Sequence, residues 1–581
     1  MLCLASRAAL AALPALLLLT PAARAAGPVA ALHHPSLSPL LAGAKDAGRA
    51  LASERHAVVV GLELRNRDAL ESFLADVQNP ASPRYGRFLT PEEFAAQYGP
   101  KPDDEAAVLA YLQANGLTVT DRFPNRLIVG ATGTVAALER AFGTEIHSVV
   151  SKGVRHYAAV REPVLPAELA AVVVGVTGLD DLSERRPHLR AAPAATLGGT
   201  FAFAPADFAT FYDEAGAPDG ATQTIVIAGA YAWRSTDISG FTGEWGLPPL
   251  PAGSTQICTG SSRAAGCNFS NSNSIEIALD VEYSHATAPG ARILNYMAAS
   301  TSNADFTTMY NRVVTDNPGH AVTTSWGACE AELPTSTQTT DDDIFANANA
   351  IGQTWFAASG DSGSRDCAGL LTVDNPANSP HVIGVGGTTP TCSSGLDAAE
   401  PACGGYESEA AWSDSGGGVS ALFARPAFQS GCGVPAGTTR LVPDVALASD
   451  TNPGEYVLDG GNWYIVGGTS GAAPQWAGFL ASVVERRGGA AIGNPGALLY
   501  GLCGGPAFHD VTSGSNGDYD AGPGYDLVTG LGTMSAADFL ALAAPTTTTT
   551  STTTTTSTTS STTTTSTATS TTTSSTITGC G

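Results

Sequence analysis

Residues 462–474 read NWYIVGGTSGAAP and join a short apolar run to a glycine-rich turn. The apolar run at 462–466 predicts a buried strand, and residues 474–487 predict a helix because their apolar side chains recur at helical spacing. Pro474 is expected in the first helical turn, which needs no internal N–H bonds. Ser470 then faces free N–H groups at a positive helix end, a place that suits attack on a carbonyl. The alternative interpretation is an ordinary capped turn.

A serine nucleophile needs a base, and the usual base is histidine. After residue 192 histidines occur only at positions 285, 320, 381 and 509, and none lies in a His-Gly-Thr-His setting, which argues against the subtilisin family. Glu276 and Asp280 offer another route, because residues four apart on a helix lie on one face, roughly 6 Å apart. Carboxylates this close raise the proton affinity of one of them and form a pair that works in acid. The alternative is a solvated polar face.

Four further motifs follow this carboxylate pair in a fixed order. They are APGA at 288–291, SWG at 325–327, ASGDSG at 358–363 and the Ser470 turn. The ordered set resembles the sedolisins, the serine-carboxyl peptidases, from the prosegment to about residue 540. The resemblance implies that Ser470 is the nucleophile, Glu276 its general base, Asp280 the support of that base, and Asp361 part of the oxyanion hole. It also implies a subtilisin-like α/β fold.

Charge agrees with an enzyme that works in acid. Asp361 can donate a hydrogen bond to an oxyanion only while protonated, and free Asp titrates near ~3.9. Residues 1–191 contain as many basic as acidic residues, so the formal charge of −25 falls on 192–581, and no lysine follows Lys152. Repulsion among these carboxylates falls as they protonate. The same charge argues against nucleic acid or an anionic membrane as a partner.

The termini predict an exported protein. A short basic and apolar stretch ends in Ala23-Arg24-Ala25 and indicates a signal peptide at 1–25, with an N-terminal anchor as the alternative. Residues 545–581 are almost pure Thr and Ser, which predicts a disordered tail, plausibly O-glycosylated. We expect a secreted, extracellular protein, with retention at the cell surface by the tail as a variant of this prediction.

Residues 28–190 predict a separate activation prosegment. Strands are expected at 58–64, 127–130 and 146–150, and helices at 68–75, 104–115 (capped by Asp103) and 135–142. This alternation predicts an α+β, ferredoxin-like domain, and YGRFLTPEEF at 85–94 resembles the activation prosegment of the same family. A freestanding binding domain is the alternative. The basic, proline-containing join at 185–193 is where we expect maturation, with the mature chain beginning between about 190 and 200.

Residues 191–544 predict one catalytic domain. Short apolar runs separated by helical stretches occur at 224–230, 293–297, 322–325, 355–358 and 382–385. Runs of this kind form buried parallel sheets, which place their sites at the carboxyl ends of the strands. The expected fold class is therefore α/β, with a subtilisin-like parallel sheet after the α+β prodomain.

Nine of the ten cysteines lie between Cys258 and Cys580. Cys258/Cys267 and Cys392/Cys403 are close enough for small loops, and Cys329/Cys367 would join two loops that carry motifs, although spacing does not fix the connectivity. Since no Cys-x-x-Cys pair occurs, a structural zinc site is not expected. The odd count leaves Cys580 as a candidate for attachment or intermolecular pairing.

Two acidic loops near the C-terminus predict a cation site. HDV at 509–511 and AGPGYD at 521–526 supply carboxylates and carbonyls, the ligands of a hard ion such as calcium. The sedolisin resemblance implies one structural Ca²⁺, with the ligand set Asp510, Val511 (carbonyl), Gly522 (carbonyl), Gly524 (carbonyl) and Asp526. Asp518 and Asp520 are nearby acids that could alter this set, and a merely acidic loop is the alternative.

Together these patterns predict a secreted, acid-acting serine-carboxyl endopeptidase made as a self-processing zymogen. Tripeptidyl-peptidase activity remains an alternative, as does a catalytically dead relative displayed on a stalk. A glycosidase that uses Glu276 and Asp280 would leave Ser470 and the prosegment unexplained. The expected partners are protein or peptide substrates and the protein's own prosegment as an inhibitor. We expect a monomer that is not inserted in a membrane after signal removal.

Overall fold

The computed structural model describes residues 28–193, 201–259, 274–367, 369–396 and 401–543. The chain divides into two units, 1–544 and 545–581, and every described residue belongs to the first. The predicted signal peptide and tail, together with Cys267 and Cys580, lie outside the described residues. Among the helices of the described ranges, none has both the length and the apolar character needed to cross a membrane.

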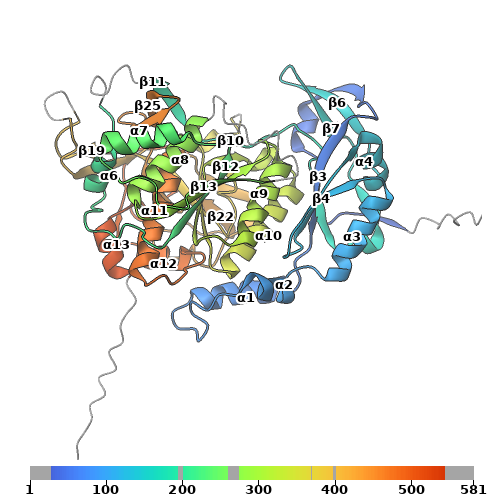
Figure 1. The fold of residues 1–581 in the computed structure, drawn as a ribbon, viewed down its shortest axis with the longest axis horizontal. Coiled ribbons are helices and arrows are strands. Elements are labelled where there is room, and N and C mark those ends of the chain that lie inside the picture. Colours follow the sequence, from blue (N-terminus) through green and yellow to red (C-terminus); the bar gives the residue numbers. More distant parts are fainter. Residues whose placement is uncertain (1–27, 194–200, 260–273, 368, 397–400, 544–581) are drawn as a thin grey trace, which may run out of the picture. The chain divides into compact units, whose positions relative to one another are not determined.

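A four-stranded antiparallel sheet lies at the centre of the N-terminal part, in the order β4-β5-β3-β9 (Figure 1). Its strands are β3 Arg55–Leu62, β4 Thr118–Arg122, β5 Ile128–Thr134 and β9 Val173–Thr177. A second sheet has the order β2-β6-β7, formed by Lys45–Arg49, Ile146–Ser151 and Val154–Ala159. The helices are α1 Arg67–Gln78, α2 Pro91–Gln97, α3 Pro102–Ala114, α4 Val135–Phe142 and α5 Ala167–Ala170. The three strands and three helices expected here are present; α4 has the expected ends, and the ends of the other five are shifted.

The start of α3 corrects one expectation. The helix begins at Pro102 and its N-cap is Lys101, so Asp103 lies inside the first turn and is not the cap. Proline suits the first helical position because its fixed φ is already helical and its missing N–H would have no partner there. Asp103, Asp104 and Glu105 favour the same helix end because they face its positive dipole.

Strand β3 joins the N-terminal part to the rest of the protein. Alternate residues of a strand point to opposite faces, and Val58 and Val60 enter the core of the N-terminal part. Val59 points the other way and packs in one cluster with Phe306 of α9 (Asn303–Asp316). Gly61 lies against α10 (Thr335–Ala350), where an added Cβ would be only 2.4 Å from a side-chain oxygen. Both faces of this sheet are therefore buried.

The catalytic part is built on an eight-stranded sheet with the order β13-β14-β12-β15-β17-β19-β20, and β23 pairs with β19. Its strands are β12 Thr224–Ala230, β13 Thr255–Cys258, β14 Arg292–Ala298, β15 Ala321–Thr324, β17 Thr354–Ala358, β19 Ile383–Cys392, β20 Tyr406–Ala411 and β23 Val445–Ala448. All five predicted strands are among them. The sheet is mixed, which corrects the expected all-parallel sheet. Strand β19 pairs antiparallel with β20, the next strand in the chain, because no crossover helix lies between them.

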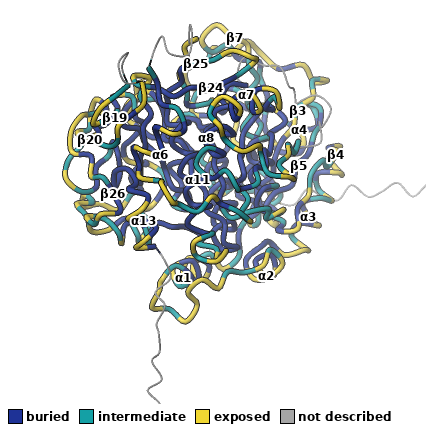
Figure 2. The backbone as a smooth tube through the Cα atoms, turned by 60° about the vertical axis from the view of Figure 1, so that its left-hand side comes forward, coloured by how far each residue is buried: buried dark blue, intermediate teal, exposed yellow. Residues whose placement is uncertain are grey.

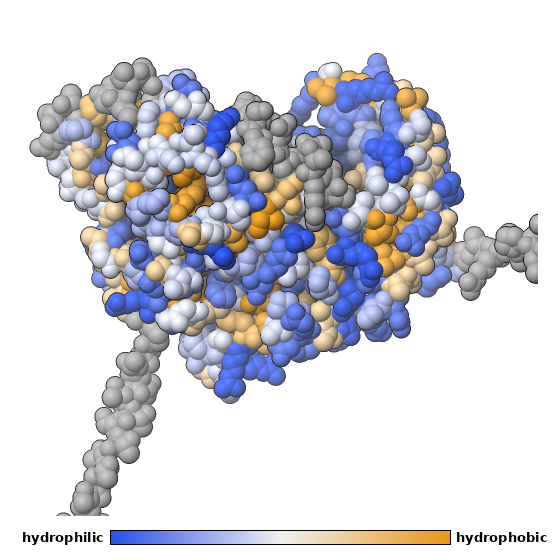
Figure 3. Space-filling model, in the orientation of Figure 1, coloured by the Kyte–Doolittle hydropathy of each residue, from blue (hydrophilic) through white to orange (hydrophobic). Residues whose placement is uncertain are grey.

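Two helical layers cover this sheet. Ile225 and Phe356 point toward α8 (Ser274–Thr287) and α11 (Thr469–Arg486), whereas Val226 and Trp355 point toward α9 and α10. The remaining helices include α6 Pro205–Phe211, α7 Ser235–Trp245, α12 Gly496–Gly501 and α13 Ala536–Leu542. Figure 2 shows α8 and α11 as buried segments inside the molecule. On the face drawn in Figure 3 hydrophilic side chains predominate, and apolar ones form separate small patches.

Disulfides tie several loops of the catalytic part. Cys329–Cys367 and Cys392–Cys403 are bonded, which confirms two of the expected pairs. Cys432–Cys503 is a third bond in the described residues, and spacing gave no indication of it. Cys258 is also disulfide-bonded, and its expected partner Cys267 lies outside the described residues.

Candidate active site

Ser470 lies in the first turn of α11, as its second residue, and not in a turn before the helix. Pro474 is therefore the sixth residue, inside the helix, and its expected place in the first turn is wrong. Because proline has no N–H, it cannot bond the carbonyl of Ser470 four residues earlier. The hydroxyl of Ser325 lies 3.4 Å from that carbonyl oxygen. The proline thus leaves the Ser470 carbonyl without its helical donor, and the Ser325 hydroxyl lies beside it, with its single proton directed at Asp280.

Glu276 and Asp280 lie one turn apart on α8, and both are fully buried, so their helix face is not solvated. Ser325 Oγ donates to Asp280 Oδ1 at 2.6 Å. The hydroxyls of Ser470 and Ser325 lie near the Glu276 carboxyl, but neither makes a hydrogen bond of regular geometry with it, and Ser470 Oγ instead donates to the carbonyl of Ser325 at 3.4 Å. Both Glu276 oxygens are free to take a proton.

Burial sets the electrostatics of this pair. It raises the pKa of Glu276 well above its ordinary value of 4.5, and the charge of Asp280 adds to the effect. Burial also raises the pKa of Asp280 to about 8, and the hydrogen bond from Ser325 opposes that rise. The charge of Asp361 also acts on Glu276, as do the Ser470 and Ser325 hydroxyls. The structure therefore brings all four predicted residues together.

Asp361 follows strand β17 and reaches the start of α11. Its Oδ1 accepts bonds from the backbone N–H and the hydroxyl of Thr469, both at 2.9 Å. Its Oδ2 has no partner among the described residues, and burial raises the pKa of this carboxyl well above its ordinary value of 3.8. Gly468 leaves room here, since an added Cβ would lie 2.6 Å from Asp361 Oδ2. A proton carried on Oδ2 would point at whatever occupies the space beside Gly468.

The join between prosegment and catalytic part occupies that space. Strand β10 (Arg186–Pro187) pairs antiparallel with β16 (Trp326–Cys329), and β11 (Arg190–Pro193) pairs antiparallel with β25 (Asn462–Gly467). Between them His188 N–H donates to the Ser325 carbonyl, and the His188 carbonyl accepts from Ser470 N–H, both at 3.1 Å. That carbonyl oxygen would lie 2.3 Å from a Cβ at Gly468. It therefore shares the same small space as Asp361 Oδ2.

The side chain of His188 lines a cavity that contains several carboxyl groups. A cavity of about 380 Å³ beside the join is lined by Asp361, Asp366 and Asp374, among others. His188 Nε2 lies 3.3 Å from Asp374 Oδ2, and both side chains are buried. Burial raises the pKa of Asp374 well above its ordinary value, and Asp366 adds to this. Sequence analysis identified neither His188 nor Asp374 as a site residue, because no motif surrounds either one.

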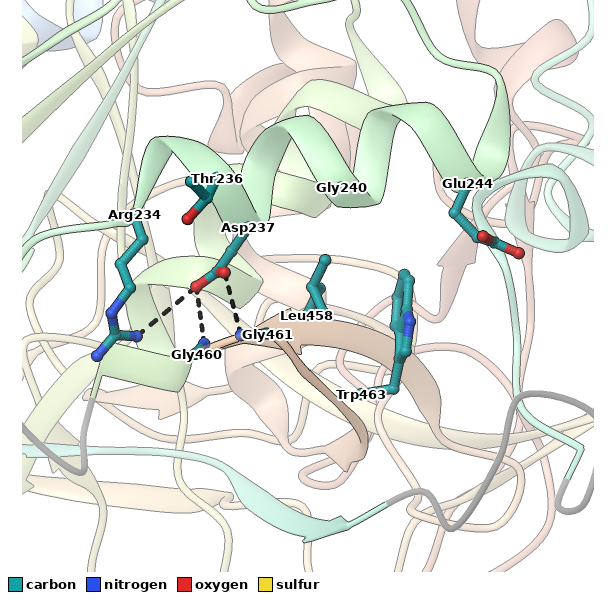
Figure 4. A pocket seen from close by; sticks show the side chains of 9 residues that line it. All are labelled: Arg234, Thr236, Asp237, Gly240, Glu244, Leu458, Gly460, Gly461 and Trp463. Atoms are coloured by element: carbon teal, nitrogen blue, oxygen red, sulfur yellow. Dashed lines mark hydrogen bonds and ion pairs between the residues drawn. The ribbon is translucent and has the colours of Figure 1, made fainter.

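Another cavity lies away from this site, and none of the four candidate residues lines it. This cavity of about 650 Å³ lies between α7 and the hairpin formed by β24 (Glu455–Asp459) and β25 (Figure 4). Asp237 accepts bonds from the N–H groups of Gly460 and Gly461 at the hairpin tip. Arg234 donates to Asp459 at 2.6 Å, and Ser274 at the start of α8 bonds the same carboxylate. These bonds anchor the hairpin to α8, the helix that carries Glu276.

The predicted cation loops meet around Gly522 and Gly524. Gly524 N–H donates to Asp510 Oδ2 at 2.9 Å, and Gly522 N–H donates to Asp526 Oδ2 at 3.1 Å. Asp526 is buried and Asp510 is exposed, while Val511 is buried beside it. Asp518 accepts a bond of 2.7 Å from Arg365, so its carboxylate is paired with that side chain and does not join the predicted ligand set.

Two other groups of His, Cys and Asp side chains lie close enough to hold a metal, but neither includes these loops. One contains the disulfide-bonded Cys329 and Cys367 with Asp374, and the other contains His188, Asp366 and Asp374. Disulfide sulfurs are not thiolate ligands, and His188 belongs to the join itself. Neither group is therefore a candidate metal centre.

Comparison with known proteins agrees with these motifs. Residues 42–182 match the family described as Pro-kumamolisin, activation domain. Sedolisin from Pseudomonas sp. (strain 101) is 32% identical over 93% of this chain and 97% of its own length. Xanthomonalisin from Xanthomonas sp. (strain T-22) is 34% identical over 82% of this chain, which spans 64% of that protein. The solved structure of Pseudomonas sedolisin, a serine-carboxyl proteinase complexed with two molecules of pseudo-iodotyrostatin, matches 59% of this chain and 98% of its own, with 31% identity and a TM-score of 0.53. The chain therefore belongs to the sedolisin family of serine-carboxyl peptidases, in a form that carries an activation domain.

Proposed function

We propose that the chain is the precursor of a secreted, acid-acting serine-carboxyl endopeptidase that removes its own prosegment. The observation that carries this proposal is the extended backbone of residues 186–193, which crosses Ser470 and pairs with a strand on either side. Extended pairing of this kind is how strand-recognising proteins hold a peptide. In the precursor the same segment occupies the cleft, which supports the prosegment as an intramolecular inhibitor.

The site residues supply each step of peptide hydrolysis. Ser470 Oγ adds to the carbonyl carbon of His188 while its proton passes to Glu276. The charge that forms on the carbonyl oxygen is stabilised by Ser470 N–H and by the proton on Asp361. Glu276 then gives its proton to the nitrogen of Leu189, and the carbon–nitrogen bond breaks. Water releases the acyl group from Ser470 by the same steps. Asp280, held by Ser325, shares the charge and the proton of Glu276.

The position of His188 specifies the bond that is cleaved during maturation. Because the His188 carbonyl accepts a hydrogen bond from Ser470 N–H, the cleaved bond is His188–Leu189, and the mature chain begins at Leu189. Leu189 lies just before the range of about 190 to 200 that was expected from sequence. The side chain before the bond faces Asp374 and Asp366 in a cavity that Lys152, Arg186 and Arg190 also line. Carboxyls accept hydrogen bonds in either protonation state, so they suit a donor such as histidine, arginine or lysine there.

One experiment tests both the function and the bond. Purified precursor, acidified without another protease, is expected to yield a chain whose N-terminal residue is Leu189, as read by mass spectrometry. The processed protein should then release peptides from an unfolded protein in acid, with basic residues enriched before the cleaved bonds. Release of sugar from polysaccharides instead would favour the glycosidase, and an absence of any product would favour the catalytically dead relative.

The join provides a path for substrate residues beyond the third position, which an endopeptidase requires and a tripeptidyl-peptidase does not use on its substrates. A tripeptidyl-peptidase must end its cleft three residues before the cleaved bond. Here Arg185, the fourth residue before the bond, still donates its N–H to the Thr301 carbonyl at 2.9 Å. The chain therefore continues past the third position in a bonded path. Internal cleavages in the peptide map would support this, and release of tripeptides alone would contradict it.

The remaining expectations stay part of this proposal. The signal peptide at 1–25 and the tail at 545–581 support export and an extracellular place of action. The order β4-β5-β3-β9, with helices between β3 and β4 and between β5 and β9, supports a ferredoxin-like prosegment at 28–190. The net charge of −25 disfavours nucleic acid as a partner. We also propose that the mature enzyme is a monomer and binds one structural Ca²⁺.

The two acidic loops fit that ion by the chemistry of their donors. Asp510 accepts from Gly524 N–H, and Asp526 accepts from Gly522 N–H. Two carboxylates therefore flank the loop that carries the carbonyls of Gly522 and Gly524. Such an oxygen set suits Ca²⁺, which when bound would neutralise the two charges and tie the loops together. Asp526 has a second role, since its Oδ1 accepts from Thr529 N–H at 2.8 Å.

Chelation of the purified protein is expected to lower its melting temperature by several degrees, and added calcium should restore it. Asp510→Asn is the cleaner variant because Asp510 is exposed and bonds only Gly524, and this variant should lose the response to calcium. Asp518→Asn is the matched control, since Asp518 bonds Arg365, and its calcium response should be retained. A metal-free preparation with the same melting curve as the calcium-loaded protein would remove the site.

A further inference from the structure

Strand β24 places a third carboxyl group directly behind the nucleophile. Glu455 is the first residue of β24 and is 3% exposed. Its carboxyl presses on Gly471, the residue after Ser470, so closely that an added Cβ would lie 1.9 Å from Glu455 Oε1. Its other oxygen accepts a bond of 3.4 Å from Gln475 on the next turn of α11. The glycine of the Gly-Thr-Ser-Gly motif is therefore required by the carboxyl that lies against it.

The same carboxyl faces the catalytic pair from the other side. After burial, the charge of Asp280 is the main influence that raises the pKa of Glu455 above its ordinary value. Asp280 Oδ2 has no hydrogen-bond partner, whereas Oδ1 is held by Ser325. Glu455 thus lies against the backbone that carries Ser470 and within electrostatic reach of the acid that supports Glu276.

We propose that Glu455 is a positioning residue of the proposed peptidase. Its carboxyl packs against the first turn of α11 and shares protons and charge with the Glu276–Asp280 pair. The three carboxyls titrate as one group, because interacting acids lose their protons as a set. A charge on Glu455 opposes a charge on Asp280, and this coupling is reciprocal. Glu455 thereby limits the fraction of Glu276 that is ionised at a given pH.

Two titratable groups on α8, Glu282 and Tyr283, are influenced by the charge of Glu455. Asp237 on α7 and Asp459 on β24 act on Glu282, and Asp207 on α6 acts on Tyr283. Arg234 bonds Asp459 and lies 3.7 Å from Asp237, so this cation is engaged at the hairpin. From α11 the contact is Gln475, which is uncharged.

Glu455→Gln tests the proposal because glutamine keeps the shape and removes the titration. The acidic limb of the pH profile of kcat should move to lower pH by about half a unit or more, because Glu455 no longer competes with Glu276 for the negative charge of the carboxyl group cluster. Glu282→Gln is the matched control. Glu282 is equally buried on α8, but its carboxyl accepts a bond from Leu458 N–H. Besides burial, the charges that raise its pKa are those of Asp237, Asp459 and Glu455, whereas the charge of Asp280 raises the pKa of Glu455. Its profile should keep the acidic limb of the wild type.

An unchanged limb in Glu455→Gln, or an equal shift in both variants, would overturn the proposal. A second measurement needs no activity, so it separates this idea from the proposed function and from poor folding. In a precursor carrying Ser470→Ala, infrared absorption of protonated carboxyl groups should persist above pH 4.5. Adding Glu455→Gln should remove one such group and lower the titration midpoint of the others. A titration that loses one group with no shift in the rest would count against the coupling.

Discussion

Ser470→Ala is expected to abolish maturation and peptidase activity together. Without its hydroxyl no acyl intermediate forms, and loss of a peptidase nucleophile reduces turnover on the order of 10⁴-fold or more. The precursor should fold, because Ser470 Oγ makes only one long bond, 3.4 Å to the Ser325 carbonyl. After acidification it should therefore keep its full prosegment, with residues 186–193 still in the cleft.

The measurement is the mass of the purified variant after incubation in acid, with no other protease present. Ser482→Ala is the matched control, since Ser482 lies on the same helix α11, is equally buried and bonds the Pro218 carbonyl at 2.6 Å. It should mature at the wild-type bond. Adding a trace of active wild-type enzyme tests whether the join can be cut in trans. Normal processing of Ser470→Ala alone would refute either the nucleophile or the self-cleavage.

Asp361→Ala is expected to lower turnover on the order of 100-fold or more, because the oxyanion loses a donor that is already in place. The geometry identifies which oxygen matters. Oδ1 is held by two bonds from Thr469, while Oδ2 is free and shares the space beside Gly468 with the His188 carbonyl. Asp361→Asn retains a donor at this place, so it should lose less activity than the alanine variant.

The pH profile distinguishes these two variants. The rate should rise with pH as Glu276 ionises and fall as Asp361 loses its proton, which gives a bell. Free acids alone would put the optimum between roughly pH 3 and 5. Burial raises the pKa of Glu276 above 4.5 and that of Asp361 above 3.8, so both limbs should lie above those values. An amide never ionises, so in Asp361→Asn the alkaline limb should be shallower.

Two results would contradict this assignment. An alkaline limb as steep in Asp361→Asn as in the wild type would show that another group causes it. A wild-type optimum near pH 8 would indicate a histidine base, and the carboxylate mechanism would then fail. Calorimetric melting of each variant checks that the loss of rate is not a loss of folding.

Local sequence predicted much of this fold because the signals are local. The apolar run at 224–230 became β12 with the same ends, and residues 135–142 became α4 in the same way. The carboxylate pair four residues apart indeed lies on one helix, α8. The prediction failed at Pro474, which was expected in the first turn of the helix. The helix α11 begins five residues earlier, at Thr469.

The sequence by itself determined which residues are the candidates for nucleophile, acid pair and oxyanion donor, because the order and spacing of their motifs resemble those of the family. It could not determine burial, and burial decides whether Glu276 and Asp280 are a wet helix face or a shared-proton pair. Nor could it bring His188 to Asp374, or Glu455 to Gly471, since each contact joins segments that are distant along the chain. Only the tertiary structure brings these distant residues together. Folding also removes water from carboxyls that an unfolded chain leaves solvated.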